Sequence, residues 1–531
     1  MRTPLRRAVS SVVASVSALA LAGCSAGHTA NYARPGDAEA IVLASTSAAS
    51  SLDFTNNGGS AAPGALLTDV YETLVRIDDD GEIKPHLATS WEVSDDRTEY
   101  IFHLRDGVNF SDGSPFNAET AAFSIAYVQN EWTNGLKAGM DVVSEATAVD
   151  EHTLRVRLRQ PDSGWLWSMG TTIGAMLSPT GVDTLASDPV GTGPLTVESF
   201  ATGESIRFAP REDYWGAPAQ TPVEIRYFSD AISSINALQS GQVDLVWAMQ
   251  APELLGSLDD SINVDIGTTN GEIIFSMNNN AAPFDDPLVR QAAAYAIDRH
   301  AANEVVFSGH ATDTAGAPVS PTDPWFDEVV QRAREAESAD LASSDDGFYP
   351  FNPDLARELL TSSSYDGELV TLTVPSLPYP RLLAELIYSQ LREVGFQVAV
   401  ETVEFPAVWL NQVHGAADYQ ASIIAHLEAR DTEHMFGNPD YYLGFDDPQV
   451  RKLFDDAATS ADPTVEMADA IELIMESAGA LTIANLPNIV LSDPSISGIT
   501  PTMVTDSIKL STLERSNHHG RDDQREQQEA A

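Results

Sequence analysis

The stretch from Gly271 to His300 constrains the fold more than any other, because a strand pattern passes directly into a helix pattern. From Glu272 to Asn278 the residues alternate, with one face formed by Ile273, Phe275 and Met277. A period of two is typical of a strand. We therefore predict a strand here, ended by the asparagines and the proline that follow.

A helix is predicted directly after this strand. Asp285 or Asp286 can cap its first turn, and Pro287 suits that turn because the missing N–H would be unpaired there anyway. Small hydrophobic residues then recur at helical spacing: Val289, Ala292, Ala293, Ala296 and Ile297. Such a stripe indicates close packing of the helix on a sheet.

Earlier in the chain, two strand patterns flank one helix pattern. Residues 223–228 and 243–247 are the strands, and their β-α-β order implies parallel pairing. Trp247 and Met249 lie at or just past the second strand's end, where α/β proteins usually bind ligands. Both are candidate ligand-binding residues.

The same order recurs in the second half of the chain. Strand patterns at 370–374, 396–400 and 419–425 alternate with helix patterns, and Trp409 falls on a short helix. The strand pattern at 489–491 follows two further helices. We interpret it as a return to the first half of the chain.

Several sequence blocks resemble the family 5 extracellular solute-binding proteins, the peptide and nickel receptors of bacterial ABC importers. They are LATSWEVSDDRTEYIFHLRDGVNFSDGSPFNAETAAFSIAYV, GTGP, DYWG, INALQSGQVDLVWA and MNNNAAPFDDPLVRQAAAYAIDR, in that order. The resemblance covers about residue 40 to residue 510. It implies an α/β, two-lobed periplasmic-binding-protein type II fold, with an extra subdomain in lobe one and two crossing strands between the lobes.

This resemblance also implies a division of the chain. We expect lobe one at 39–275, an extra subdomain within it at about 70–185, lobe two at 276–488, a return to lobe one at 489–512, and a disordered tail at 513–531. The polar, acidic stretch 331–347 has no clear apolar face and is expected to be a surface insertion. The paired histidines in the tail are expected to be solvated.

The N-terminus has the features of a bacterial lipoprotein signal. Three arginines precede an uncharged apolar run, and LAGC follows at once, ending at Cys24. The run is shorter than the ~20 residues that span a bilayer. We therefore predict a signal peptide at 1–23, lipidation of Cys24, a tether at 24–38, and anchoring on the extracytoplasmic face of the cell membrane. Cys24 is the only cysteine, which excludes disulfides.

The charge balance excludes one class of partner. With 29 basic against 78 acidic residues, the formal net charge is −49, whereas nucleic-acid binding needs basic patches. We expect instead a peptide or other small solute and, by the resemblance, an ABC permease in the membrane. The protein itself is expected to be a monomer without a cofactor.

The resemblance also suggests where a ligand would bind. The pair Tyr71 and Glu72 matches a tyrosine-glutamate pair near the ligand, with a buried Tyr71 and a solvated Glu72 as the alternative. In the family's peptide binders an anchoring aspartate follows a tryptophan in W-x-x-D. Here His426 stands for the tryptophan, and Glu428 or Asp431 could replace the aspartate.

Arg430 could meet a ligand carboxylate, or be an ordinary exposed loop arginine. Two further candidates come from the analogy and the expected cleft: Asn278 and Trp409. A peptide requires a carboxylate at its ammonium and a cation at its carboxylate. This set therefore favours an oligopeptide.

Other functions stay open at this point. His426 and His434 suggest a metal or nickel-chelate ligand, although their spacing is not a known metal pattern. An opine or a sugar, or a signalling or adhesion role without transport, are further alternatives. The sequence lacks G-x-S-x-G, H-E-x-x-H and S-x-x-K motifs, so we expect no enzyme and no dedicated metal site.

Overall fold

The computed structural model describes residues 40–56, 59–337 and 347–516. The predicted signal peptide, Cys24, the tether and the tail from residue 517 lie outside the described residues. Within these ranges, none of the helices has the length and apolar character needed to cross a bilayer.

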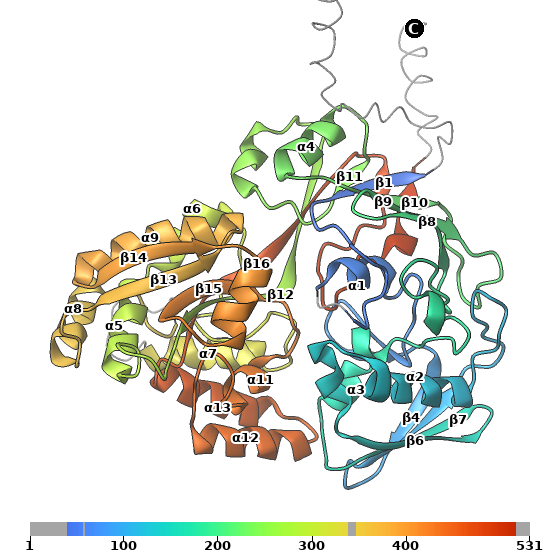
Figure 1. The fold of residues 1–531 in the computed structure, drawn as a ribbon, viewed down its shortest axis with the longest axis horizontal. Helices are drawn as coiled ribbons and strands as arrows, with labels where there is room; N and C mark the ends of the chain where they lie inside the picture. The colour runs from blue at the N-terminus through green and yellow to red at the C-terminus, as the bar shows by residue number, and fades with distance from the viewer. Residues whose placement is uncertain (1–39, 57–58, 338–346, 517–531) are drawn as a thin grey trace, which may run out of the picture. The chain divides into compact units, whose positions relative to one another are not determined.

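The largest element of the structure is a ten-stranded sheet with the order β14-β13-β15-β12-β16-β11-β1-β10-β9-β8. Figure 1 shows its strands. In chain order they are β1 (Ile41–Ser45), β8 (Leu195–Ala201), β9 (Ser205–Pro210), β10 (Val223–Tyr227), β11 (Leu245–Val246), β12 (Asn263–Met277), β13 (Leu369–Pro375), β14 (Gln397–Val403), β15 (Ala421–His426) and β16 (Leu481–Ser492).

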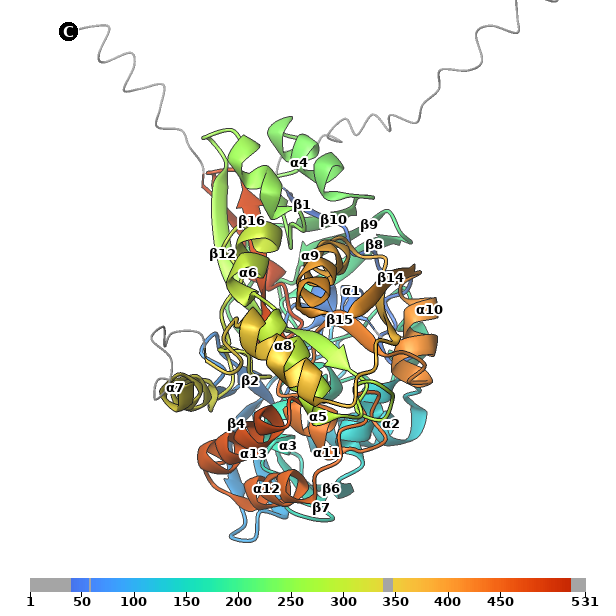
Figure 2. The same ribbon diagram turned by 90° about the vertical axis from the view of Figure 1, so that its left-hand side faces the viewer.

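Strands β12 and β16 connect the two halves of this sheet. They pair antiparallel from Asn263 to Phe275 on β12, and the later part of β12 pairs also with β15. The end of β16 pairs with β11 in the other half. Both views show the two long strands side by side (Figures 1 and 2). They are the two crossing strands that the resemblance implies.

Buried hydrophobic residues form two large clusters, one on each side of the crossing strands. One draws on residues from Ile41 to Trp247 and from Val490 to Leu513, and the other on residues from Ile273 to Ala484. We refer to the part built on the first cluster as lobe one and to the part built on the second as lobe two.

The predicted β-α-β unit is present. Strands β10 and β11 both pair parallel with β1, which lies between them, and α4 (Ala231–Gln239) connects them. The Asp230 side chain caps α4 by accepting from the Ser233 amide. The second strand is shorter than predicted, because only Leu245 and Val246 make ladder contacts.

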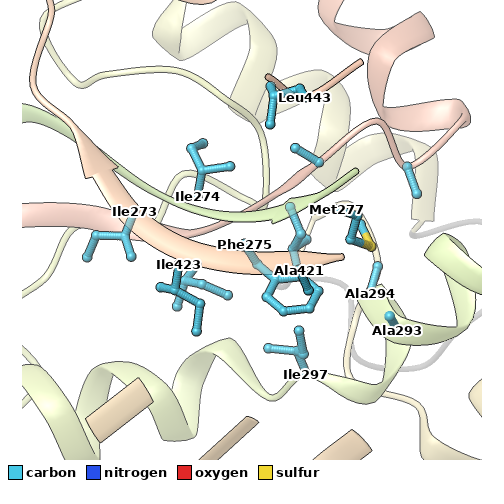
Figure 3. Packing of buried hydrophobic residues seen from close by; sticks show 14 of the residues in the cluster. Ile273, Ile274, Phe275, Met277, Ala293, Ala294, Ile297, Ala421, Ile423 and Leu443 are labelled. Carbon is cyan, nitrogen blue, oxygen red and sulfur yellow. The ribbon is translucent and has the colours of Figure 1, made fainter. Parts of the chain in front are cut away.

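The strand-to-helix stretch also forms as predicted. Asp286 caps α5 (Pro287–Ala296) by accepting from the Leu288 amide. All five residues of the small hydrophobic stripe are buried. Figure 3 shows the core that they join, where Ile297 and Ala293 lie near Phe275 of β12. Small side chains on α5 therefore allow the close packing that the sequence indicates.

A four-stranded antiparallel sheet forms the extra part of lobe one. Its order is β4 (Ala88–Val93), β5 (Glu99–Leu104), β7 (Thr153–Leu158) and β6 (Val143–Asp150). Helix α2 (Ala118–Glu131) packs on it, with a capping box at Asn117. Short elements complete the lobe: α1 (Ala61–Leu66), β2 (Val75–Ile77), β3 (Ile83–Pro85), α3 (Trp165–Ser168), β17 (Ile496–Ser497) and β18 (Glu514–Arg515).

The remaining helices belong to lobe two. They are α6 (Arg299–Phe307), α7 (Phe326–Glu337), α8 (Pro353–Ser362), α9 (Pro378–Val394), α10 (Ala407–Trp409), α11 (Thr432–Gly437), α12 (Pro448–Thr459) and α13 (Thr464–Glu476). Gly395 ends α9 in the left-handed conformation, as its position after the last periodic residue indicates. Figure 2 shows α12 and α13 side by side.

Three sequence expectations are wrong. Leu67, Tyr71, Leu74 and Val75 recur at helical spacing, which predicts a helix, but none forms there, because α1 ends at Leu66 and Thr68 adopts φ +68°. The stretch from residue 331 is not all surface insertion, since α7 extends to Glu337 and buries Ala333 against the core. The C-terminal segment is ordered through residue 516, because Leu513 is buried and β18 pairs with β17.

Candidate functional site

A row of polar side chains crosses three adjacent strands of the sheet, β15, β12 and β16. Glu272 on β12 lies directly opposite His426 on β15 and opposite Asn485 on β16. Opposed residues of antiparallel strands project on the same face. All three are buried, with Glu272 only 2% exposed. The row therefore places an acid, an imidazole and an amide together inside the protein.

Two members of this row have polar atoms that the protein itself does not satisfy. Among the described residues, neither Glu272 Oε2 nor the side-chain oxygen and nitrogen of Asn485 has a hydrogen-bond partner. An unsatisfied buried polar group costs ~1–3 kcal/mol, and most such groups have partners. The row is therefore a candidate for contact with a ligand.

Two aspartates lie close to Glu272. Burial raises the pKa of Glu272, and the charges of Asp323 and Asp431 raise it further. Burial likewise raises the pKa of Asp323 to about 6, although the Ser320 amide donates to its Oδ2 and Arg430 lies near it. Asp323 Oδ1 has no partner among the described residues. Three carboxyl groups thus share a buried region.

Arg430 is the cation of this region. Its guanidinium lies 4.5 Å from the ring centroid of Trp167 and 5.9 Å from that of Trp325, and its Nη2 donates to the Gly81 carbonyl at 3.2 Å. Burial lowers its pKa to about 10, so it remains charged at neutral pH. Arg430 is not an ordinary exposed loop arginine, because the residue is half-buried and its guanidinium lies over the Trp167 ring.

Three residues predicted from the sequence come together at the end of β15. One ligand atom from each of His426, Glu428 and Asp431 lies within 4.8 Å of the others. The imidazole is held in place, with Nε2 2.9 Å from the Tyr442 hydroxyl and Nδ1 3.6 Å from Asp431 Oδ2. Glu428 is exposed and Asp431 is buried. Two carboxylates and an imidazole suit an ammonium group or a divalent cation.

A cavity of about 730 Å³, within the size range of small-molecule sites, is lined by Arg430, the sequence neighbour of Asp431, but not by the three residues of the group themselves. Residues of both lobes line it, among them Asp162 and Trp167 of lobe one and Arg430 and His434 of lobe two. His434 packs against the Tyr441 ring and is not part of the three-residue group. Arg430 therefore connects the open cavity to the buried carboxyl groups.

The side chains of Tyr71 and Glu72 are buried inside lobe one. Tyr71 is fully buried, which agrees with the alternative of a buried Tyr71. Glu72 is 1% exposed, so the solvated alternative is wrong. Its carboxylate accepts from the Tyr214 hydroxyl at 2.7 Å and from Trp215 Nε1 at 2.9 Å, and His86 Nε2 lies at 2.9 Å. These contacts occupy both oxygens.

The other sequence candidates also lie inside the lobes. Trp247 belongs to the core of lobe one, whereas Met249 belongs to a separate cluster with α4. Asn278 donates to the carbonyls of residues 417 and 419, and Trp409 Nε1 donates to Ser422 Oγ. The structure thus does not bring these four residues together with the group at His426.

Sequence reasoning missed Glu272, Asp323, Trp325 and Asn485. Glu272 carried a signal, because it is the one charged residue in the strand from Glu272 to Asn278. Asp323 and Trp325 carried none, since they lie in a loop before α7 that only the fold brings to β12.

The fold matches solved structures of two-lobed type II periplasmic binding proteins. One is DppA from Helicobacter pylori in complex with the peptide STSA, with a TM-score of 0.75 and 23% identity over 90% of this chain and 98% of that chain. Another is NikA from Staphylococcus aureus in complex with Ni(L-His)2, with a TM-score of 0.73 and 15% identity over 90% of this chain and 100% of that chain. These likenesses define the fold class.

The family follows from the sequence. Residues 82–442 match the model of the bacterial extracellular solute-binding proteins, family 5 Middle. The chain therefore belongs to the family 5 extracellular solute-binding proteins. This confirms the resemblance on which the fold was predicted.

Curated relatives agree with this assignment. Heme-binding protein A of Haemophilus influenzae is 29% identical over 375 residues, covering 63% of this chain and 65% of that protein. Glutathione-binding protein GsiB of Salmonella typhi is 28% identical over 352 residues, covering 64% and 65%. The match thus spans 65% of the length of both relatives. They are binding proteins and not enzymes, which agrees with the expectation for this chain.

Proposed function

We propose that the protein is an extracytoplasmic substrate-binding lipoprotein of an ABC importer, which captures oligopeptides between its lobes and delivers them to a permease. The family membership supports a solute receptor, and Cys24 in its lipobox-like context supports the anchor. The observation that carries the ligand class is the group of His426, Glu428 and Asp431, whose ligand atoms lie within 4.8 Å of one another.

The charge of this group favours the amino end of a peptide. An ammonium group donates three hydrogen bonds, and carboxylates accept them strongly. Glu428 and Asp431 supply two such acceptors, and His426 Nδ1 adds a third when that nitrogen is unprotonated. Arg430 lies beside them and its Nε has no partner among the described residues, so a peptide carbonyl or carboxylate is its natural complement.

Ligand capture is coupled to closure of the lobes. Arg430 of lobe two contacts the Gly81 carbonyl and the Trp167 ring of lobe one. A ligand that touches both lobes shifts the population toward the closed form by its differential contacts. The closed form is then the state that a permease would receive.

The test compares one peptide with and without its charged amino end. Residues 25–531 are titrated with trialanine and with N-acetyl-trialanine in a calorimeter. We expect acetylation to weaken binding by ~30-fold or more, because truncating one partner of a hydrogen-bonded charge pair costs ~2–5 kcal/mol. Glu428→Gln should weaken the binding of trialanine but not that of N-acetyl-trialanine. Glu385→Gln, a change at an exposed position of α9, should weaken neither. Equal binding of both peptides would contradict the proposal.

A metal or metal chelate is the second candidate, favoured by the same three side chains. One imidazole and two carboxylates provide nitrogen and oxygen ligands that suit nickel or zinc. Titration with nickel chloride and with nickel-histidine distinguishes a bare metal ion from a metal chelate as the ligand. Nickel binding that is lost in His426→Asn, with no heat from peptides, would favour this candidate over the peptide receptor.

Transport itself needs a cellular test, because a signalling or adhesion lipoprotein could keep the same fold. Deletion of the gene should abolish uptake of a labelled peptide, and the wild-type chain should restore it. The Cys24→Ala variant should not restore uptake, because it is not retained at the membrane. Normal uptake in the deletion strain would contradict the transport role.

A further inference from the structure

We propose that Glu272 and Asp323 form a second cation subsite beneath the ammonium group at His426, so that the receptor prefers peptides carrying a basic side chain over neutral ones. This inference rests on the proposed function, because it assumes that the first positive charge binds at His426, Glu428 and Asp431. It adds a class of substrate: peptides with a lysine-like or arginine-like residue near the amino end.

The position of Glu272 follows from the sheet register. It is the direct neighbour of His426 across the β12–β15 ladder, where opposed Cβ atoms are ~5 Å apart. Asp431 Oδ2 lies 3.6 Å from His426 Nδ1, and its charge acts on Glu272. Glu272 therefore lies in the same buried region as the proposed ammonium site. A positive charge on the first or second residue of a bound peptide would complement it.

Several buried acceptors in this region have no donor. Glu272 Oε2 and Asp323 Oδ1 are buried without hydrogen-bond partners among the described residues, and so are both the side-chain oxygen and the side-chain nitrogen of Asn485 opposite Glu272. Glu272 and Asp323 are 2% and 5% exposed. Ionised carboxylates only accept hydrogen bonds, so they do not satisfy each other. An ammonium or guanidinium group provides several donors at once.

The guanidinium of Arg430 balances only part of this negative charge. It is close enough to lower the pKa of Asp323, but it lies over the Trp167 ring, its Nη2 donates to the Gly81 carbonyl, and its Nε has no hydrogen-bond partner among the described residues. Glu272, Asp323, Glu428 and Asp431 carry four negative charges when ionised, against one positive charge on Arg430. This surplus of negative charge favours a ligand with two positive charges, one from its amino end and one from a side chain, over a ligand with only one.

The experiment uses two pairs of tripeptides: Lys-Ala-Ala and Ala-Lys-Ala, each with its norleucine counterpart. Norleucine keeps the length of lysine and removes the charge. For the wild type at about pH 7, we expect at least one lysine peptide to bind ~10-fold or more tightly than its counterpart.

Variants locate the preference. Glu272→Gln and, separately, Asp323→Asn should each reduce the ratio of affinities to within about threefold, whereas Glu385→Gln should keep the wild-type ratio. Asp323→Asn keeps the inference testable where Glu272→Gln does not fold. Equal binding of lysine and norleucine peptides by the wild type overturns the subsite and leaves the peptide receptor intact. Failure of all four peptides to bind overturns both proposals.

Discussion

The guanidinium of Arg430 lies 4.5 Å from the ring centroid of Trp167, and both groups contact the carbonyl oxygen of Gly81. Trp167 belongs to α3 in lobe one, whereas Arg430 follows β15 in lobe two. The neighbouring Ala429 packs against the small cluster of Ile77, Trp167 and Val504. These contacts join the two lobes next to the proposed binding site.

We predict that Arg430→Ala weakens ligand binding without unfolding either lobe. A cation–π contact contributes ~0.5–2 kcal/mol and a hydrogen bond to a charged group ~1.5–3 kcal/mol, together ~2–5 kcal/mol, so affinity should fall by roughly 30-fold or more. Titration with trialanine measures the change. Arg392→Ala is the matched control, because Arg392 lies 5.3 Å over Tyr388 within a single helix. Equal affinities in both variants would contradict a role for Arg430 in closure.

A second prediction concerns Gly81, which has φ +77° and packs against the other lobe. A Cβ at this position would lie 2.6 Å from the Thr322 carbonyl oxygen. Gly81→Ala should therefore hinder closure, and small-angle scattering should show little ligand-induced compaction. Gly107→Ala has a similar φ of +73° with no atom within 4 Å of its Cβ, so it controls for backbone strain. Equal compaction in both variants would show that the contact does not limit closure.

A third prediction concerns pH. Burial raises the pKa of Asp323 to about 6 in the folded protein, above its ordinary value. The folded state then binds more protons than the unfolded state. The contribution of Asp323 to the free energy of unfolding is therefore present at low pH and is lost as pH rises through about 6. The free energy of unfolding of Asp323→Asn minus that of the wild type should rise by about 1–3 kcal/mol from about pH 4 to about pH 7. Urea unfolding without ligand measures this, and a constant difference across that range would refute it.

A fourth prediction separates structure from binding at Glu72. Its carboxylate accepts from Tyr214 and Trp215 and lies beside His86, so Glu72→Gln replaces an acceptor with a donor. We expect a loss of ~1–3 kcal/mol in unfolding free energy with peptide affinity unchanged. Chemical unfolding and calorimetry on the same sample test this. A loss of peptide affinity without a loss of unfolding free energy would show that Glu72 belongs to the ligand site.

Much of the fold was accessible from the sequence because local signals agreed with it. The alternating pattern predicted the strand at the end of β12, the strand pattern at 370–374 predicted β13, and Asp286 caps α5 as predicted. The spacing around Tyr71 failed because tertiary burial, and not a helix, explains its hydrophobic pattern.

The site was only partly accessible. His426, Glu428 and Asp431 are close in sequence and meet in space, so a local motif found them. Glu272 joins them through strand register and Asp323 through a distant loop, and neither relation has a local signature. Aromatic candidates such as Trp409 were misplaced because burial in a core and exposure in a cleft look alike in sequence.

The most direct test of a receptor with an acidic site is to identify the solute that it retains. Residues 25–531 are purified under native conditions and denatured, and the released small molecules are analysed by mass spectrometry with parallel metal analysis. A solute at a hundredfold excess over its dissociation constant stabilises the fold by ~2.7 kcal/mol, which favours retention. We predict short peptides with a free amino end, enriched in lysine and arginine. Recovery of a sugar or another solute without a positive charge would contradict the account.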